Sequence, residues 1–99
     1  MRRAVFAASF DRDAENIGVY IERRFGERVR REFVADLART CANLAAFPGM
    51  GHGAHGYRTT LRGFVFRLSW VFFEYDDNEA RFLHMRDSRM NKPDQLFSK

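Results

Sequence analysis

The chain has a single cysteine, Cys41, among its 99 residues. One thiol cannot form an internal disulfide, and its isolation fits a reducing cytoplasm. Long apolar runs are also missing, because the longest, from Trp70 to Phe73, is far too short to cross a bilayer. Residues 1–3 lead into only five or six apolar residues, so we expect no secretory signal. These absences predict a cytoplasmic protein that does not enter a membrane.

Acidic residues are scarce in much of the second half. None lies between residues 57 and 73, and residues 80–92 hold one aspartate against three arginines and a lysine. Between residues 11 and 46, in contrast, acids and arginines balance. The net charge is +4 and the pI is about 9.8. The uneven distribution predicts an anionic partner, either a nucleic acid or an acidic protein segment.

The length and the eleven phenylalanines predict one domain over residues 1–99, with a polar tail from about residue 88. Residues 4–8 are typical of a short strand, and Ser9 or Asp11 could cap a following helix. Gly26 and Pro48 each end an amphipathic helix, so the two helices form an antiparallel hairpin. The apolar positions are Ala14, Ile17, Tyr20, Ile21 and Phe25, then Val29, Phe33, Leu37, Cys41 and Leu44.

Three strands are predicted after a glycine-rich loop over residues 50–56. They cover residues 57–62, 64–73 and about 80–85, with a turn at residues 76–78. Alternation in the second strand places one set of side chains toward the core: Phe64, Phe66, Leu68, Trp70 and Phe72. The predicted fold is α+β, in the order β-α-α-β-β-β. The helical hairpin packs on one face of a small, mainly antiparallel sheet, and the other face is open and basic.

Several local motifs accompany this order of elements. They are Tyr20–Gly26, Pro48-Gly49-Met50-Gly51, Leu61-Arg62, Phe66-Arg67-Leu68 and Leu83-His84-Met85-Arg86-Asp87. With them the chain resembles the RelE/ParE superfamily of bacterial toxins from type II toxin–antitoxin modules, and it is closer to the ParE-type members. The resemblance covers nearly the whole chain. It implies a toxin that inhibits growth until a cognate antitoxin neutralises it.

The resemblance implies two alternative activities. ParE-type members poison DNA gyrase without known nuclease chemistry, whereas RelE-type members cut mRNA on the ribosome. We expect the ParE-like activity, because Phe97 stands in the tail where RelE-type sites have a tyrosine and Leu83–Asp87 resembles the ParE ending. An inactive binding domain of the same fold is a third hypothesis. The protein would be an enzyme, an endoribonuclease, only under the RelE-like alternative.

Candidate site residues follow from these alternatives. In a RelE-like nuclease, His84 would transfer a proton near neutral pH, while Arg67 and Arg89 would stabilise charge on the phosphate. For either toxin, a basic face would contact the target or the antitoxin. Its predicted members are Arg58, Arg62, Arg67, Arg81, Arg86 and Arg89.

No cofactor and no metal site are predicted. His52 and His55 form a His-x-x-His pair that, with Cys41 and His84, could suggest zinc. Cys41 lies on an apolar helical stripe, however, and the two loop histidines are expected to be merely exposed. The expected partners are the antitoxin and either gyrase or the ribosome with its mRNA. We expect the antitoxin to add a helix to an apolar groove and a strand to the edge of a four-stranded sheet.

Overall fold

The computed structural model describes residues 2–53 and 60–87. Its elements follow the chain as β1 (Arg3–Phe6), α1 (Ala8–Phe25), α2 (Glu27–Ala46), the 3₁₀ turn η1 (Pro48–Met50), β2 (His52–Gly53), β3 (Arg62–Phe66), β4 (Ser69–Tyr75) and β5 (Glu79–Asp87). The sheet has five strands in the order β1-β5-β4-β3-β2. Only the β1–β5 pair is parallel among the described strands. The predicted α+β fold is confirmed, with the two-residue β2 as an addition.

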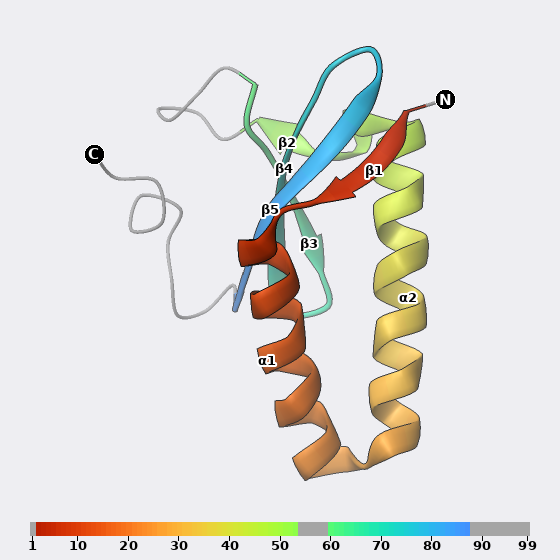
Figure 1. Cartoon of the computed structure of the whole chain (residues 1–99), viewed down its shortest axis with the longest axis vertical. Helices are drawn as coiled ribbons and strands as arrows, with labels where there is room; N and C mark the ends of the chain where they lie inside the picture. The colour runs from red at the N-terminus through yellow and green to blue at the C-terminus, as the bar shows by residue number, and fades with distance from the viewer. Residues whose placement is uncertain (1, 54–59, 88–99) are drawn as a thin grey trace, which may run out of the picture.

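The helices form the predicted antiparallel hairpin and pack on one side of the sheet (Figure 1). Gly26 ends α1 with a φ of 94°, a conformation that suits glycine, and donates its N–H to the Glu22 carbonyl. The α2 helix ends at Ala46, two residues before Pro48. The predicted cap of α1 is wrong: Ala7 occupies that position without a side-chain hydrogen bond, and the Ser9 hydroxyl donates to Leu83 in β5.

Arg30 joins the two helices through a pair of charge-assisted hydrogen bonds. Its guanidinium donates to the carboxylates of Glu15 and Glu22 on α1, each at 2.8 Å. The hydrogen bonds with Glu22 and Glu15 raise the pKa of Arg30. Arg30 passes close to Gly18, where a Cβ atom would lie 3.2 Å from its Nε. Glycine at position 18 therefore leaves space for the Arg30 side chain to lie across α1 and reach both glutamates.

The predicted strand over residues 64–73 is wrong, because a turn at Arg67 and Leu68 divides it into β3 and β4. Nothing in the sequence marks this turn, since it contains no glycine, proline or asparagine. Arg67 has a φ of 58°, which costs an L-residue roughly 1–2 kcal/mol. Antiparallel pairing of the two strands over five residue pairs offsets that cost.

The turn also reverses which residues of β4 face the core. Because Phe66 pairs with Ser69, the helix-facing residues after the turn are Val71 and Phe73. Trp70 and Phe72 therefore lie on the outer face, and Leu68 is 58% exposed, contrary to the alternation. The first predicted strand is wrong in its bounds as well: residues 57–59 lie outside the described part, and β3 begins only at Arg62.

The core lies between the sheet and the helical hairpin. Its members from the sheet include Phe66, Val71, Phe73, Phe82 and Met85, and those from the helices include Phe10, Phe33, Leu37, Cys41 and Leu44. Four of the apolar positions predicted on α2 are thus confirmed as core, whereas the fifth, Val29, is half-buried and lines a groove. The predicted turn at residues 76–78 is also confirmed, with the Asp76 carboxylate accepting hydrogen bonds from the N–H groups of Asn78 and Glu79. Within residues 2–53 and 60–87, no helix has the length and apolar character to cross a membrane.

The position of Cys41 leads to a first prediction. The residue is fully buried, and burial raises the pKa of its thiol to about 12. At pH 8 the thiol should be protonated and enclosed. Its reaction with Ellman's reagent should therefore be at least about 100-fold slower in the folded protein than in urea, because the reagent reaches the thiol only when the protein unfolds locally or globally. Rapid modification of the folded protein would contradict this packing.

Candidate functional site

The outer face of the sheet, away from the helices, carries an aromatic pair beside two candidate site residues. Strand register aligns Val65, Trp70 and Arg86 in one row, and Gly63, Phe72 and His84 in the next. Side chains opposite one another in a sheet share a face. The Trp70 and Phe72 rings stack with their centroids 5.8 Å apart, and a Cβ atom at Gly63 would lie 3.1 Å from Trp70. Glycine thus leaves room for the indole ring on this face.

Asp13 from α1 joins His84 and Arg86 at the edge of β5. One carboxylate oxygen accepts the Met85 N–H at 3.1 Å and lies 3.2 Å from Nδ1 of His84. The other oxygen lies 2.6 Å from Nη1 of Arg86. The Asp13 side chain is only 12% exposed, and those of His84 and Arg86 are 26% and 29% exposed. One carboxylate therefore holds a backbone amide, an imidazole and a guanidinium together.

The start of α1 explains why Asp13 reaches this edge. β1 pairs with β5 only as far as Phe6 and Phe82. Beyond that point, the Ala7 N–H donates to the Phe82 carbonyl, and the Ser9 hydroxyl donates to Leu83. Asp13 then accepts the next available N–H, that of Met85. The first turns of α1 thus replace β1 along the second half of β5.

Sequence reasoning missed Asp13, which is 71 residues from His84. A signal was present, however, in the helical pattern. Phe10, Asp13, Ala14 and Ile17 follow the i, i+3, i+4, i+7 spacing of one helical face. An acid in an apolar stripe indicates a buried partner, because an unpaired charge there is costly.

The other predicted site arginines are dispersed rather than gathered on one open face. Arg67 in the β3–β4 turn contacts Asp36 of α2, and its guanidinium lies 6.0 Å from the centre of the Phe33 ring. Arg81 binds Asp76 and Glu79 near the β4–β5 turn. Arg62 donates to the Gly51 carbonyl, while its buried Nε has no partner among the described residues. Arg58 and Arg89 lie outside the described residues.

The structure describes some, but not all, of the residues that were considered as metal ligands. Cys41 is enclosed in the core, and His52 is exposed on β2, so these two side chains have different environments. His55 lies outside the described residues. Among residues 2–53 and 60–87, no three histidine, cysteine or acidic side chains are arranged to hold a metal ion.

A second feature is an apolar groove of about 600 Å³ between the helical hairpin and the β3–β4 turn. Its walls include the exposed rings of Tyr20 and Phe25 and the exposed Leu68. Arg67 supplies a cation at the turn, beside Asp36. Arg39 and Arg67 hold the pKa of that carboxyl below its usual range. The remaining walls are formed by Asn16, Ile17, Ile21, Val29, Phe33 and Ser69.

The fold and these residues can now be compared with known proteins. The family model described as the ParE toxin of the type II toxin–antitoxin system, parDE, matches residues 4–91. Because this match covers most of the chain, the chain belongs to the ParE toxin family. The resemblance to ParE-type members of the RelE/ParE superfamily is thereby confirmed. A search of curated proteins gave no significant match.

Solved structures share the fold at low sequence identity. A chain of the chromosomal ParDE system from P. aeruginosa has a TM-score of 0.73 and 15% identity, over 88% of this chain and 96% of that one. The conserved protein HP0894 from Helicobacter pylori has a TM-score of 0.58 and 16% identity, over 90% and 97%. A chain of the E. coli DinJ–YafQ toxin–antitoxin complex has a TM-score of 0.53 and 14% identity, over 89% and 93%.

The Asp13 cluster gives a second prediction. Replacing Asp13 with alanine leaves the Met85 N–H without an acceptor and the Arg86 guanidinium with only the Met85 carbonyl, so the free energy of unfolding should fall by about 2–3 kcal/mol. Asp13→Asn keeps an oxygen for Met85 and should cost about 1 kcal/mol. Urea denaturation measures both changes. Asp11→Asn, an exposed position in the same helix, is the matched control, and an equal loss there would contradict a specific role for Asp13.

Proposed function

We propose that this member of the ParE toxin family inhibits growth by poisoning DNA gyrase and is neutralised by a cognate antitoxin. The observation that carries the proposal is the match of the ParE family model to residues 4–91. The geometry is consistent with it. Arg67, Arg81 and Arg86 each contact a carboxylate of this chain, whereas an RNA-cleaving site needs cations available to a phosphate.

One observation favours the RelE-like alternative. Asp13 lies against Nδ1 of His84, and a carboxylate in that place can fix the orientation of an imidazole that transfers protons. Trp70 lies on the same sheet face and is half-buried, and an accessible aromatic ring can stack on a base, whereas its neighbour Phe72 is only 1% exposed. We rank this alternative second, because the same carboxylate also binds Arg86. An inactive binding domain is the third candidate.

The two activities predict opposite results for purified toxin. As a gyrase poison, it should make gyrase accumulate cleaved DNA while a translating extract remains active. His84→Gln should leave that gyrase effect within about threefold, because no proton transfer by the toxin is required. Cleaved mRNA in the extract, abolished by His84→Gln, would instead establish the nuclease. Expression without antitoxin that fails to arrest growth would favour the inactive domain.

The antitoxin is proposed to occupy the apolar groove with an amphipathic helix. Exposed apolar surface of this kind is typical of helix-in-groove recognition, and Tyr20, Phe25 and Leu68 supply it. A carboxylate on the incoming helix could compete with Asp36 for Arg67. A strand would add to β1, whose four residues are all exposed at one edge of a sheet of five strands rather than four. Such a complex should bury more than ~1,200 Å².

A charged residue in the groove should weaken the complex without unfolding the toxin. Leu68→Asp places a carboxylate in the apolar wall at a position that is 58% exposed. We expect antitoxin affinity to fall at least about 30-fold, corresponding to roughly 2 kcal/mol. Val34→Asp is the control, because Val34 is similarly exposed on α2 but does not line the groove. Titration calorimetry with the cognate antitoxin should separate the two variants, and equal losses would reject this docking site.

A further inference from the structure

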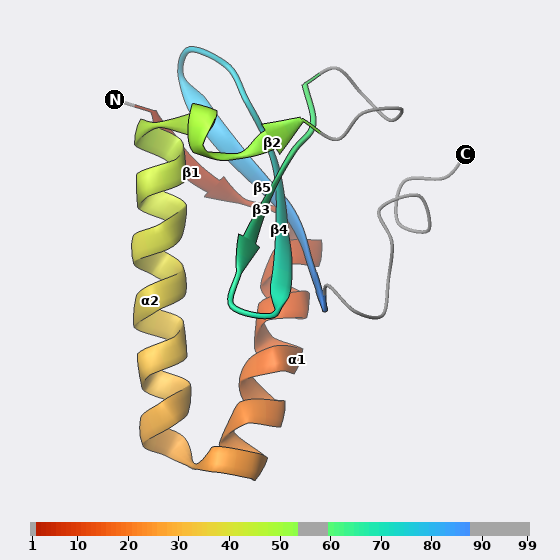
Figure 2. The same ribbon diagram turned by 180° about the vertical axis from the view of Figure 1, so that it is seen from behind.

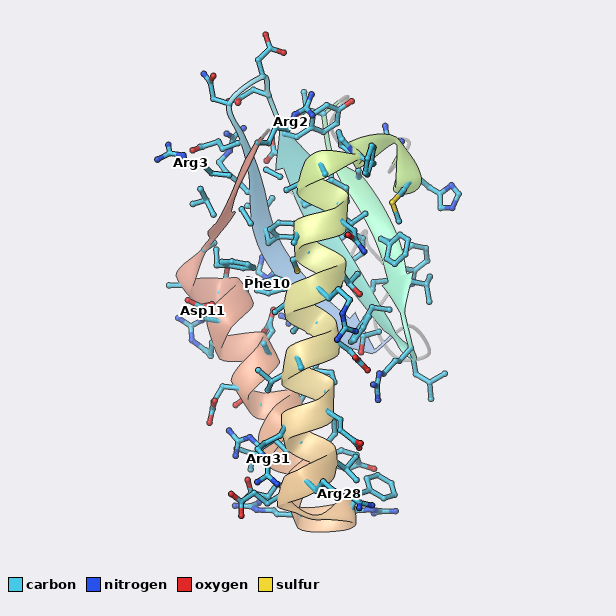
Figure 3. All side chains as sticks on the ribbon, turned by 90° about the vertical axis from the view of Figure 1, so that its right-hand side faces the viewer. Arg2, Arg3, Phe10, Asp11, Arg28 and Arg31 are labelled. Atoms are coloured by element: carbon cyan, nitrogen blue, oxygen red, sulfur yellow. The ribbon has the colours of Figure 1, made fainter. Side chains whose placement is uncertain are left out.

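We infer that the tip of the helical hairpin binds the phosphate backbone of a nucleic acid. The hairpin tip is defined here as residues 20–32, where α1 ends and α2 begins. Figures 1 and 2 show that it extends well past the ends of the strands. It lies at the opposite end of the molecule from Arg2 and Arg3, as the labelled positions of Arg28 and Arg31 indicate (Figure 3).

Three arginines at the tip are exposed and have no acidic partner among the described residues: Arg23, Arg24 and Arg28. Arg24 lies over the Tyr20 ring, 5.5 Å from its centre, and this contact leaves its charge uncompensated. The arginines nearer the sheet are different, because Arg67, Arg81 and Arg86 each bind a carboxylate. Among the described residues, the exposed arginines without an acidic partner are therefore concentrated at the hairpin tip, with Arg12 of α1 as the exception.

The acids of the tip do not cancel this charge. Glu22 is bound by Arg30, and Glu27 by Arg31 at 3.1 Å. Glu32 remains exposed, so residues 22–32 hold five arginines against three glutamates. Glu15 supplies the second partner of Arg30 from farther along α1. The three arginines without acidic partners thus dominate the charge presented at the end of the hairpin.

The shape of the tip favours phosphate over an acidic protein segment. A projecting surface can approach a nucleic-acid backbone from outside, whereas an amphipathic helix of a protein partner binds in an apolar groove. Every cation at the tip is arginine, whose planar guanidinium can bind a phosphate, as it can a carboxylate, through two hydrogen bonds. The adjacent groove, with its apolar walls, is the concave surface suited to a protein helix. The two surfaces meet at Tyr20 and Phe25.

The test measures binding of purified toxin to a fluorescein-labelled 20-base-pair duplex of arbitrary sequence by anisotropy, across a range of salt concentrations. Each phosphate contact contributes about −0.9 to the slope of log K against log salt. Changing Arg23, Arg24 and Arg28 together to glutamine should make the slope less negative by about 2.5 and reduce affinity at least tenfold at ~0.1 M salt. Thermal melts should confirm that the variant remains folded.

A control variant removes the same charge elsewhere, by changing Arg3, Arg12 and Arg39 to glutamine. These side chains are exposed and far from the tip along the helices and β1, and Arg3 and Arg39 bind Glu79 and Asp36. The slope should therefore change by less than about 0.5, because salt screens distant charges. Equal effects of the two triple variants, or no duplex binding at low salt, would overturn the proposal. Weakened antitoxin binding by the tip variant alone, without duplex binding, would assign the tip to an acidic protein segment. The assay contains no gyrase, so its outcome is independent of gyrase poisoning.

Discussion

The unequal lengths of β1 and β5 constrain the rest of this structure. β5 has nine residues, whereas its parallel neighbour β1 has four, so half of one edge of β5 would otherwise expose unpaired backbone groups. Ser9 and Asp13 satisfy that edge from α1. The helix is thereby fixed beside the sheet, and α2 follows it through Gly26. The position of the apolar groove and the arrangement of the Asp13 cluster both depend on this closure.

The elements that could be predicted from the sequence are those specified by local patterns. The two helices carry apolar stripes over several turns, and Gly26 and Pro48 mark where the chain leaves each helix, so neither needs distant contacts to be identified. The turn at Arg67 could not be found in this way. Its backbone conformation is unfavourable for arginine, and the compensation comes from pairing of β3 with β4 and from contacts with Asp36 and Phe33 on α2. Such long-range contacts leave no local sequence signal.

The same limitation applies to the candidate site. The motif resemblance identified His84 and several arginines, but not the acids that contact them. The sequence separates a balanced helical half from a basic strand half, yet folding brings Asp13 to Arg86 and Asp36 to Arg67. Charge asymmetry along a chain therefore does not imply the same asymmetry on its surface. Within the described part of the chain, the exposed arginines without an acidic partner lie on the helices, at positions that appear balanced in the linear sequence.

The two-residue turn between β3 and β4 has a consequence for how this chain can vary in length. The turn fixes the parity of β4, so that Val71 faces inward and Trp70 outward. A residue inserted within β4 itself would exchange these two faces and turn the core side chains of β4 toward solvent. A residue added to the turn can instead be accommodated by a longer hairpin loop, because loops of three to five residues also join paired strands. Evolutionary or engineered extensions at this end of the groove should therefore occur in the turn and not in β4.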